Sequence, residues 1–120
     1  MDDGPSLGDF DSAIRRLATS FDECVRSQVG SRPWRSAHFE VRYAADGSLW
    51  NDKMRVLTAG SETISLGTTN DLRRLLVELN DLRRVLGWYS LGLELRPDGS
   101  VEVGYGYDPD AVNDPSFFDD

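Results

Sequence analysis

Residues 88–107 read WYSLGLELRPDGSVEVGYGY, and apolar and polar side chains alternate on both sides of the central Pro97-Asp98-Gly99. Alternation with a period of two is typical of a strand that has one buried and one solvated face. Pro-Asp-Gly fits a type I turn followed by a left-handed glycine, which is the three-residue connection of a β-hairpin. The stretch therefore predicts an antiparallel hairpin, with these side chains facing the core: Leu91, Leu93, Val101, Val103, Tyr105 and Tyr107.

Two amphipathic helices are predicted in the part of the chain that precedes this hairpin. Apolar residues recur at helical spacing from Phe10 onward, which predicts a helix at about residues 10–29 that ends near Gly30. A second stripe of leucines runs from the cap residues 68–71 to Gly87. The side chains expected in the core are Ile14, Leu17, Phe21, Leu72, Leu75 and Leu79, and those expected on the solvated face of the second helix are Arg73, Arg74, Glu78, Asp81, Arg83 and Arg84.

Strands are predicted between the two helices. Residues 39–43 alternate apolar and polar side chains, residues 45–48 supply a turn, and residues 49–57 predict a return strand. A short third strand is possible at residues 62–66. The order of elements is then α-β-β-(β)-α-β-β. The sequence thus predicts an α+β fold, with an antiparallel sheet of four to five strands packed against two helices.

Length and charge narrow the class of protein. A chain of 120 residues has the size of one domain, so residues 1–120 are expected to share one core, with residues 108–120 as a loop or partly ordered acidic tail. The net charge of -8 repels nucleic acid and anionic lipid and attracts basic surfaces. The single cysteine and the lack of an export signal favour a reducing compartment. We therefore expect a cytoplasmic protein with neither a nucleic-acid nor a membrane partner.

Few residues of this sequence are suited to catalysis. His38, the single histidine, falls on the solvated face of a predicted strand. Cys24 falls on the core side of the first helix, where burial disfavours the thiolate that a Cys24–His38 dyad would need. A calcium site around Asp108, Asp110 and Asp114 lacks the spacing of an EF-hand loop. The sequence favours a protein that is not an enzyme and that holds no cofactor or metal.

The C-terminal part of the chain is strongly acidic. Residues 97–120 contain seven acidic residues and no basic residue, whereas the second predicted helix balances its charges. We expect the negative field to concentrate at one end of the molecule and to attract a basic protein. Aromatic residues beside such acids are typical of protein interfaces. The candidate partner-binding residues are Trp50, Asp98, Glu102, Tyr107, Asp108, Asp110 and Asp114.

Residues 87–99, GWYSLGLELRPDG, together with Tyr105-Gly106-Tyr107-Asp108, resemble the C-terminal half of the YezG-like immunity proteins. The most distinctive positions are Trp88 and the closing Tyr107-Asp108. The resemblance implies a small bacterial α+β protein that binds a cognate polymorphic toxin, often a basic nuclease-type domain, and occludes it stoichiometrically. An acidic chaperone or adaptor for a secretion system, which would hold its partner through the helix surfaces and the tail, is the alternative function. Neither alternative fixes the oligomeric state.

Overall fold

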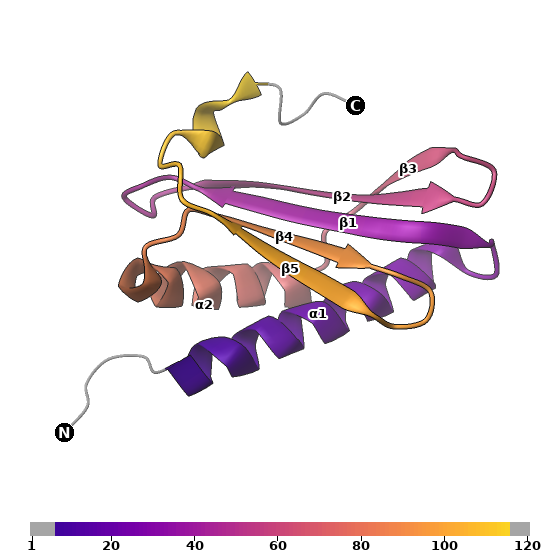
Figure 1. Cartoon of the computed structure of the whole chain (residues 1–120), viewed down its shortest axis with the longest axis horizontal. Helices are drawn as coiled ribbons and strands as arrows, with labels where there is room; N and C mark the ends of the chain where they lie inside the picture. The colour runs from indigo at the N-terminus through magenta and orange to yellow at the C-terminus, as the bar shows by residue number, and fades with distance from the viewer. Residues whose placement is uncertain (1–6, 116–120) are drawn as a thin grey trace.

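The computed structural model describes residues 7–115, which form two α-helices, a five-stranded sheet and a short 3-10 turn (Figure 1). All strand pairs are antiparallel, and the order across the sheet is β3-β2-β1-β4-β5. The predicted α+β class and order are confirmed, and the optional third strand is present. Along the chain the elements are α1 (Leu7–Val29), β1 (Trp34–Tyr43), β2 (Trp50–Thr58), β3 (Thr63–Leu66), α2 (Asn70–Leu86), β4 (Ser90–Leu95), β5 (Val101–Gly106) and η1 (Ala111–Asn113).

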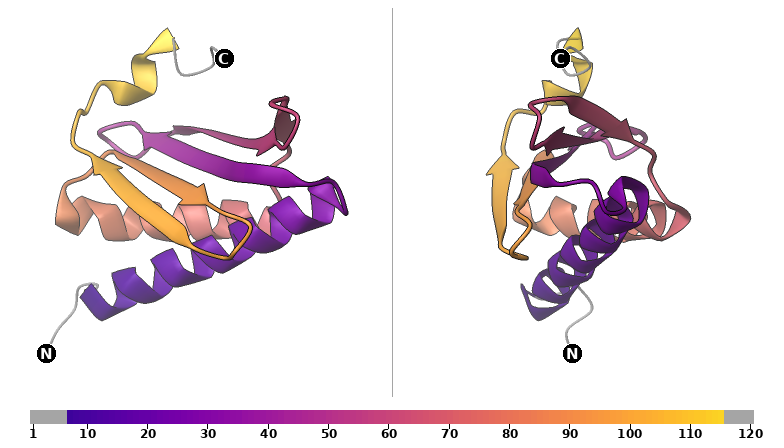
Figure 2. Two further views of the ribbon diagram at one scale, coloured as in Figure 1. Left: turned by 45° about the vertical axis from the view of Figure 1, so that its right-hand side comes forward. Right: turned by 90° about the vertical axis from the view of Figure 1, so that its right-hand side faces the viewer.

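Both α-helices lie against the same face of the sheet (Figures 1 and 2). Among the described residues, no α-helix covers the opposite face. β1 lies in the middle of the sheet, so alternate residues from Ala37 to Tyr43 are buried beneath the helices. The Tyr43 hydroxyl donates a hydrogen bond to the Leu76 carbonyl at 2.7 Å, which satisfies the one polar group of that side chain. Burial of apolar surface in this single layer is the main force that holds sheet and helices together.

The β4–β5 hairpin has the geometry that its sequence predicts. The N–H of Arg96 donates to the carbonyl of Ser100 at 3.0 Å, and the N–H of Gly99 donates back to the carbonyl of Arg96 at 2.9 Å. Gly99 has a φ of 90°, which a residue with a side chain rarely adopts. The three-residue connection is therefore confirmed.

Helix α2 is capped as its sequence predicts, but its buried stripe is rotated. Thr69 caps the N-terminus by accepting a hydrogen bond from Leu72 N, and Gly87 ends the helix with a φ of 78°. Leu76 is fully buried, whereas Leu75, which we predicted in the core, is only half-buried. Arg83, which we predicted on the solvated face, is 1% exposed. Arg83 can be buried there because the backbone carbonyls of Trp88 and Ala44 accept hydrogen bonds from its guanidinium.

Of the predicted core positions of β5, Val101 packs half-buried against the core, but the later positions are wrong. Val103 and Tyr105 are each 39% exposed, and Tyr107, which follows the strand, is 65% exposed. Both strand residues pair in register with buried residues of β4, so they face the helix side of the sheet. β5 is the border strand, however, and the helices do not cover it as they cover β1. The alternation of residues predicts the face of the sheet on which a side chain lies. It does not predict how far the helices extend over that face.

Candidate protein-binding surface

The outer face of the sheet, defined here as the face turned away from α1 and α2, contains an open hollow. Successive residues of a strand point to opposite faces, so the outer face carries the residues that alternate with the buried ones. We call its central depression, of about 650 Å³, the outer hollow. The side chains that line it on this face are His38, Glu40, Lys53, Arg55, Leu57, Thr63, Glu94 and Glu102.

Glycines form the floor of the outer hollow. Gly92 of β4 pairs with Glu40 of β1 on one side and with Gly104 of β5 on the other. A Cβ added at Gly104 would meet nothing within 4 Å, and at Gly92 the nearest atom is a backbone oxygen at 3.9 Å. The backbone there would accept larger residues, so the hollow exists because these two positions carry no side chain.

A row of polar and charged side chains crosses the outer hollow from β2 to β5. The register aligns Arg55 with His38, His38 with Glu94, and Glu94 with Glu102. Arg96 lies 2.6 Å from the Glu94 carboxylate and 3.1 Å from that of Glu102. Its hydrogen bond to Glu102 is the main reason why the pKa of Arg96 is raised. Such exposed pairs contribute little stability, so the charges can be re-paired with a partner at small cost.

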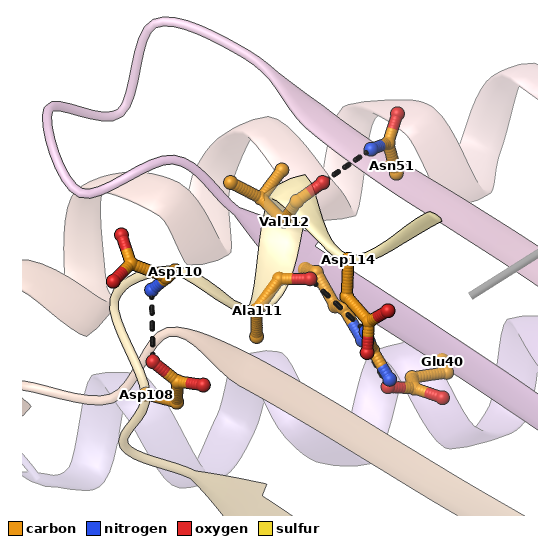
Figure 3. A network of polar contacts seen from close by, with 8 residues as sticks. Glu40, Asn51, Asp108, Asp110, Ala111, Val112 and Asp114 are labelled. Carbon is orange, nitrogen blue, oxygen red and sulfur yellow. Dashed lines mark hydrogen bonds and ion pairs between the residues drawn. The ribbon is translucent and has the colours of Figure 1, made fainter. Parts of the chain in front are cut away.

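The C-terminal segment, residues 107–115, folds back over one end of the outer face (Figure 3). Arg42 of β1 donates to the carbonyl of Ala111 at 3.0 Å, and Asn51 of β2 donates to the carbonyl of Val112 at 3.0 Å. Val112 is buried. The part of the predicted acidic tail that the structure describes is thus fastened to the sheet, and residues 116–120 lie outside the described range.

The predicted acids do not gather at one end of the molecule. Asp98 lies in the β4–β5 turn, and Glu102 lies in β5 within the outer hollow. β5 spans 6 residues. At about 3.4 Å per residue, roughly 20 Å of strand separates Asp98 from Asp108. The expectation of a single acidic end is therefore wrong, and a second group, on the C-terminal segment, consists of Asp108, Asp110 and Asp114.

The two predicted aromatic anchors differ in their exposure. Tyr107 is 65% exposed and precedes the acids of the C-terminal segment. Trp50 is paired with Tyr43, with ring centroids 5.7 Å apart, and packs half-buried against the core on the helix side. Tyr107 is exposed to solvent, whereas Trp50 packs on the helix side and is not part of the outer face.

Two of the acids also shape the local backbone. The carboxylate of Asp98 accepts a hydrogen bond from the N–H of Ser100 at 2.8 Å, and that of Asp108 accepts one from the N–H of Asp110 at 3.0 Å. The hydrogen bond from Ser100 is the main cause of the lowered pKa of Asp98. Asn can accept the same bond through its side-chain oxygen, so an Asp-to-Asn change removes the charge and keeps the turn.

The sequence candidates for a thiol dyad lie on opposite sides of the sheet. Cys24 is buried in α1 on the helix side, and burial raises the pKa of its thiol, whereas His38 lies on the outer face. Within residues 7–115, no group of three or more His, Cys, Asp or Glu side chains is arranged to hold a metal ion. Neither helix of that range has an apolar stretch long enough to cross a membrane.

Sequence reasoning missed the basic residues of the outer face. Arg42, Lys53 and Arg55 alternate with buried residues of β1 and β2. The period-two pattern of residues 38–42 and 51–55 could therefore have placed these basic side chains on the solvated face. The outer face therefore carries both signs of charge, with carboxylates from Glu40 and β4–β5 facing cations from β2. A complementary partner must present acids as well as bases.

Comparison of the sequence with protein-family models and with curated proteins found no match. The similarity to YezG-like immunity proteins therefore rests on the quoted residues of the β4–β5 region alone, and the function that it implies is a proposal.

Proposed function

We propose that this protein is an immunity-type inhibitor that binds a predominantly basic toxin domain through the outer face and the C-terminal segment. The observation that carries the proposal is the outer hollow. It is an open, charge-lined surface of about 650 Å³ on the face of the sheet that the helices leave uncovered (Figure 2). The opposite face of the sheet is occupied by its own helices, so the outer face is the broad sheet surface that is left for a partner.

Charge supports a basic partner. The chain carries a net charge of -8, and the acids of the C-terminal segment contribute to it on this side of the sheet, while the outer hollow itself holds carboxylates beside Lys53 and Arg55. Complementary fields of this kind raise association rates up to about 10⁸ per molar per second at low salt. An exposed aromatic ring near such charges is the type of side chain that dominates binding energy in many interfaces. Tyr107 is the candidate for this role.

The direct test expresses candidate toxin domains taken from the genes next to this chain's own gene. We expect co-expression of the chain to restore growth, and we expect purified chain to reduce the toxin's activity to zero at one inhibitor per toxin. Inhibition that needs a large excess of chain, or a toxin that binds but stays fully active, would contradict an inhibitor that acts by occlusion.

The alternative is an acidic chaperone or adaptor for a secretion system. A shallow groove between α1 and α2 supports it, because Thr19 and Glu23 of α1 face Leu75 and Glu78 of α2 across that groove, and Val77 is 52% exposed. A chaperone would hold its partner through these helices and leave the partner's activity intact. Binding that is lost on substitutions in the groove, and kept on substitutions in the outer face, would favour this alternative.

A further inference from the structure

Strand β5 forms one border of the sheet, with β4 as its single strand partner among the described residues. Figure 2 shows it at the edge of the molecule, with no described element beyond it. A border strand presents unpaired N–H and C=O groups that can pair with another chain. This edge is therefore a place where a further strand can be added.

The hydrogen-bond phase identifies which backbone groups of β5 are available. In antiparallel pairs, hydrogen-bonded and non-bonded positions alternate. The bond from Arg96 N to Ser100 O sets the phase of the hairpin, so Glu102 and Gly104 bond to β4. The alternate residues of β5 are Val101, Val103 and Tyr105. Their backbone N–H and C=O groups consequently point away from β4, toward the open edge of the sheet.

The bond from Tyr43 N to Tyr89 O, at 2.8 Å, gives the same phase independently. It shows that the backbone groups of Leu91 and Leu93 bond to β1. The backbone groups of Gly92 and Glu94 therefore bond to β5. Two separate hydrogen bonds thus agree on the direction of the free backbone groups.

The two borders of the sheet are protected to different degrees. β3, at the other border, is only 4 residues long. β5 is 6 residues long and reads VEVGYG, with no proline, lysine or arginine. Natural border strands usually avoid pairing through shortness, proline or charged side chains. β5 has a single charge, on Glu102, and is the less protected border.

The side chains of β5 define what an added strand must carry. Val103 and Tyr105 are each 39% exposed on the helix side, so partner residues opposite them should be apolar. On the outer side, Glu102 stands beside Gly104, where no side chain limits the approach of a partner residue. A basic residue opposite Glu102 would share its carboxylate with Arg96, which lies 3.1 Å away, and the neighbouring Asp98 adds to the negative potential.

We infer that β5 accepts a positively charged extended segment of a partner protein, which adds antiparallel as a sixth strand with apolar residues on the helix side and basic residues on the outer side. The inference rests on the proposed function only in taking the partner to be a basic protein. Charge disfavours a second copy of this chain, since two molecules of net charge -8 would meet with Glu102 of each near the shared edge.

The test uses a short, capped peptide of alternating valine and lysine, titrated into the full chain at neutral pH. Its valine N–H groups should bond to β5 and its lysine N–H groups should point away. We therefore expect the peptide to bind, and we expect N-methylation of its valines to weaken binding at least about tenfold, because several backbone bonds are lost. N-methylation of its lysines should leave the affinity nearly unchanged.

Amide exchange and one pair of variants locate the peptide. At a peptide concentration about ten times Kd, exchange at Val103 and Tyr105 should slow about tenfold, because only the free protein exchanges. Val103→Pro removes an outward N–H and should abolish binding, whereas Val103→Ala keeps that N–H and should bind. The two methylated peptides are compared on the wild-type chain. Their affinities therefore test strand addition even if Val103→Pro does not fold.

Three results would overturn antiparallel strand addition: no binding of the unmethylated peptide, weakening by lysine methylation that equals or exceeds weakening by valine methylation, or a β5-mediated dimer seen by sedimentation with Val103 protected in the absence of peptide. Toxin inhibition is measured without the peptide. If inhibition holds while Val103 stays unprotected by the peptide, strand addition is overturned and the inhibitor proposal stands.

Discussion

Arg83 of α2 is a buried cation, and no carboxylate within residues 7–115 lies within bonding distance of it. Its guanidinium donates to the Asn80 side-chain oxygen at 3.0 Å, to the Trp88 carbonyl at 3.3 Å and to the Ala44 carbonyl at 2.8 Å. It also lies 4.9 Å from the centre of the Tyr43 ring. Burial lowers the pKa of Arg83, yet an arginine stays charged in proteins. One planar group therefore joins the end of α2 to the loop after β1 and the start of β4.

We predict that Arg83→Lys reduces the free energy of unfolding by about 1–3 kcal/mol, because an ammonium lacks the planar fork and leaves a buried acceptor unsatisfied. Urea unfolding of the variant gives this quantity. The matched control is Arg73→Lys on the exposed side of the same helix, which should have a free energy of unfolding close to that of the wild type. Equal stabilities for the two variants would mean that the Arg83 bonds contribute nothing.

Cys24 is predicted to resist thiol reagents in the folded protein. Its side chain is 4% exposed and burial raises the pKa of the thiol, so the reactive thiolate is scarce at neutral pH. Labelling should proceed only as fast as the protein opens, and should become immediate in denaturant. A Cys24→Ala, Thr19→Cys protein places the thiol on the exposed side of α1 and should label at once. Similar rates in both native proteins would refute the burial of Cys24.

At the scale of elements, α2 shows where a repeat of leucines is ambiguous. Leu75 and Leu76 are neighbours in the sequence and both fit a helical stripe, but only Leu76 is fully buried. The choice depends on the rotation of the helix, which the buried Arg83 and the bond from Tyr43 to the Leu76 carbonyl help to set. These contacts come from distant parts of the chain, so the periodicity of α2 alone could not settle the rotation.

The leucine pair gives a prediction for this element. Leu76→Ala should cost about 2–5 kcal/mol of unfolding free energy, because a buried side chain is removed and a cavity remains. Leu75→Ala should cost clearly less, because Leu75 is partly solvated. Both values come from denaturant midpoints at a common m-value. The opposite ranking would restore our sequence-based assignment of Leu75 to the core.

The C-terminal segment depends on Arg42, whose side chain bonds the Ala111 carbonyl and lies 3.6 Å from the Asp114 carboxylate. We predict that Arg42→Leu frees this segment. A hydrogen bond from a charged group contributes about 1.5–3 kcal/mol, so amide exchange at residues 111–114 should accelerate at least about tenfold. Arg35→Leu, on an exposed position of β1, is the control. Unchanged exchange in Arg42→Leu would show that other contacts hold the segment.

For the whole molecule, the sequence was sufficient for the fold class, the order of elements and the β4–β5 turn, because these follow from local periodicity and turn chemistry. It was insufficient for the surface. Asp98 and Asp108 are close in the sequence but lie at opposite ends of β5, and the position of Asp114 depends on Arg42 of a distant strand. The mixed charge of the outer hollow likewise arises from pairing between β2, β1 and β4, which no local pattern encodes.

The central claim is that a basic partner binds the outer face and the C-terminal segment. The most direct measurement is the association rate with the toxin domain at low and high salt. It compares the wild type with two variants of equal charge, one on the proposed surface and one on the helices. The first changes Asp to Asn and Glu to Gln at Asp98, Glu102, Asp108, Asp110 and Asp114, and the second does so at Asp22, Glu23, Asp71, Glu78 and Asp81.

Both variants lose the same net charge, so only the position of the charge differs between them. We predict that the surface variant associates at least about tenfold more slowly at low salt and loses most of its salt dependence, whereas the helix variant stays close to the wild type. A folded surface variant with an unchanged association rate, or a helix variant that is slowed as much, would contradict the claim and place the interface elsewhere.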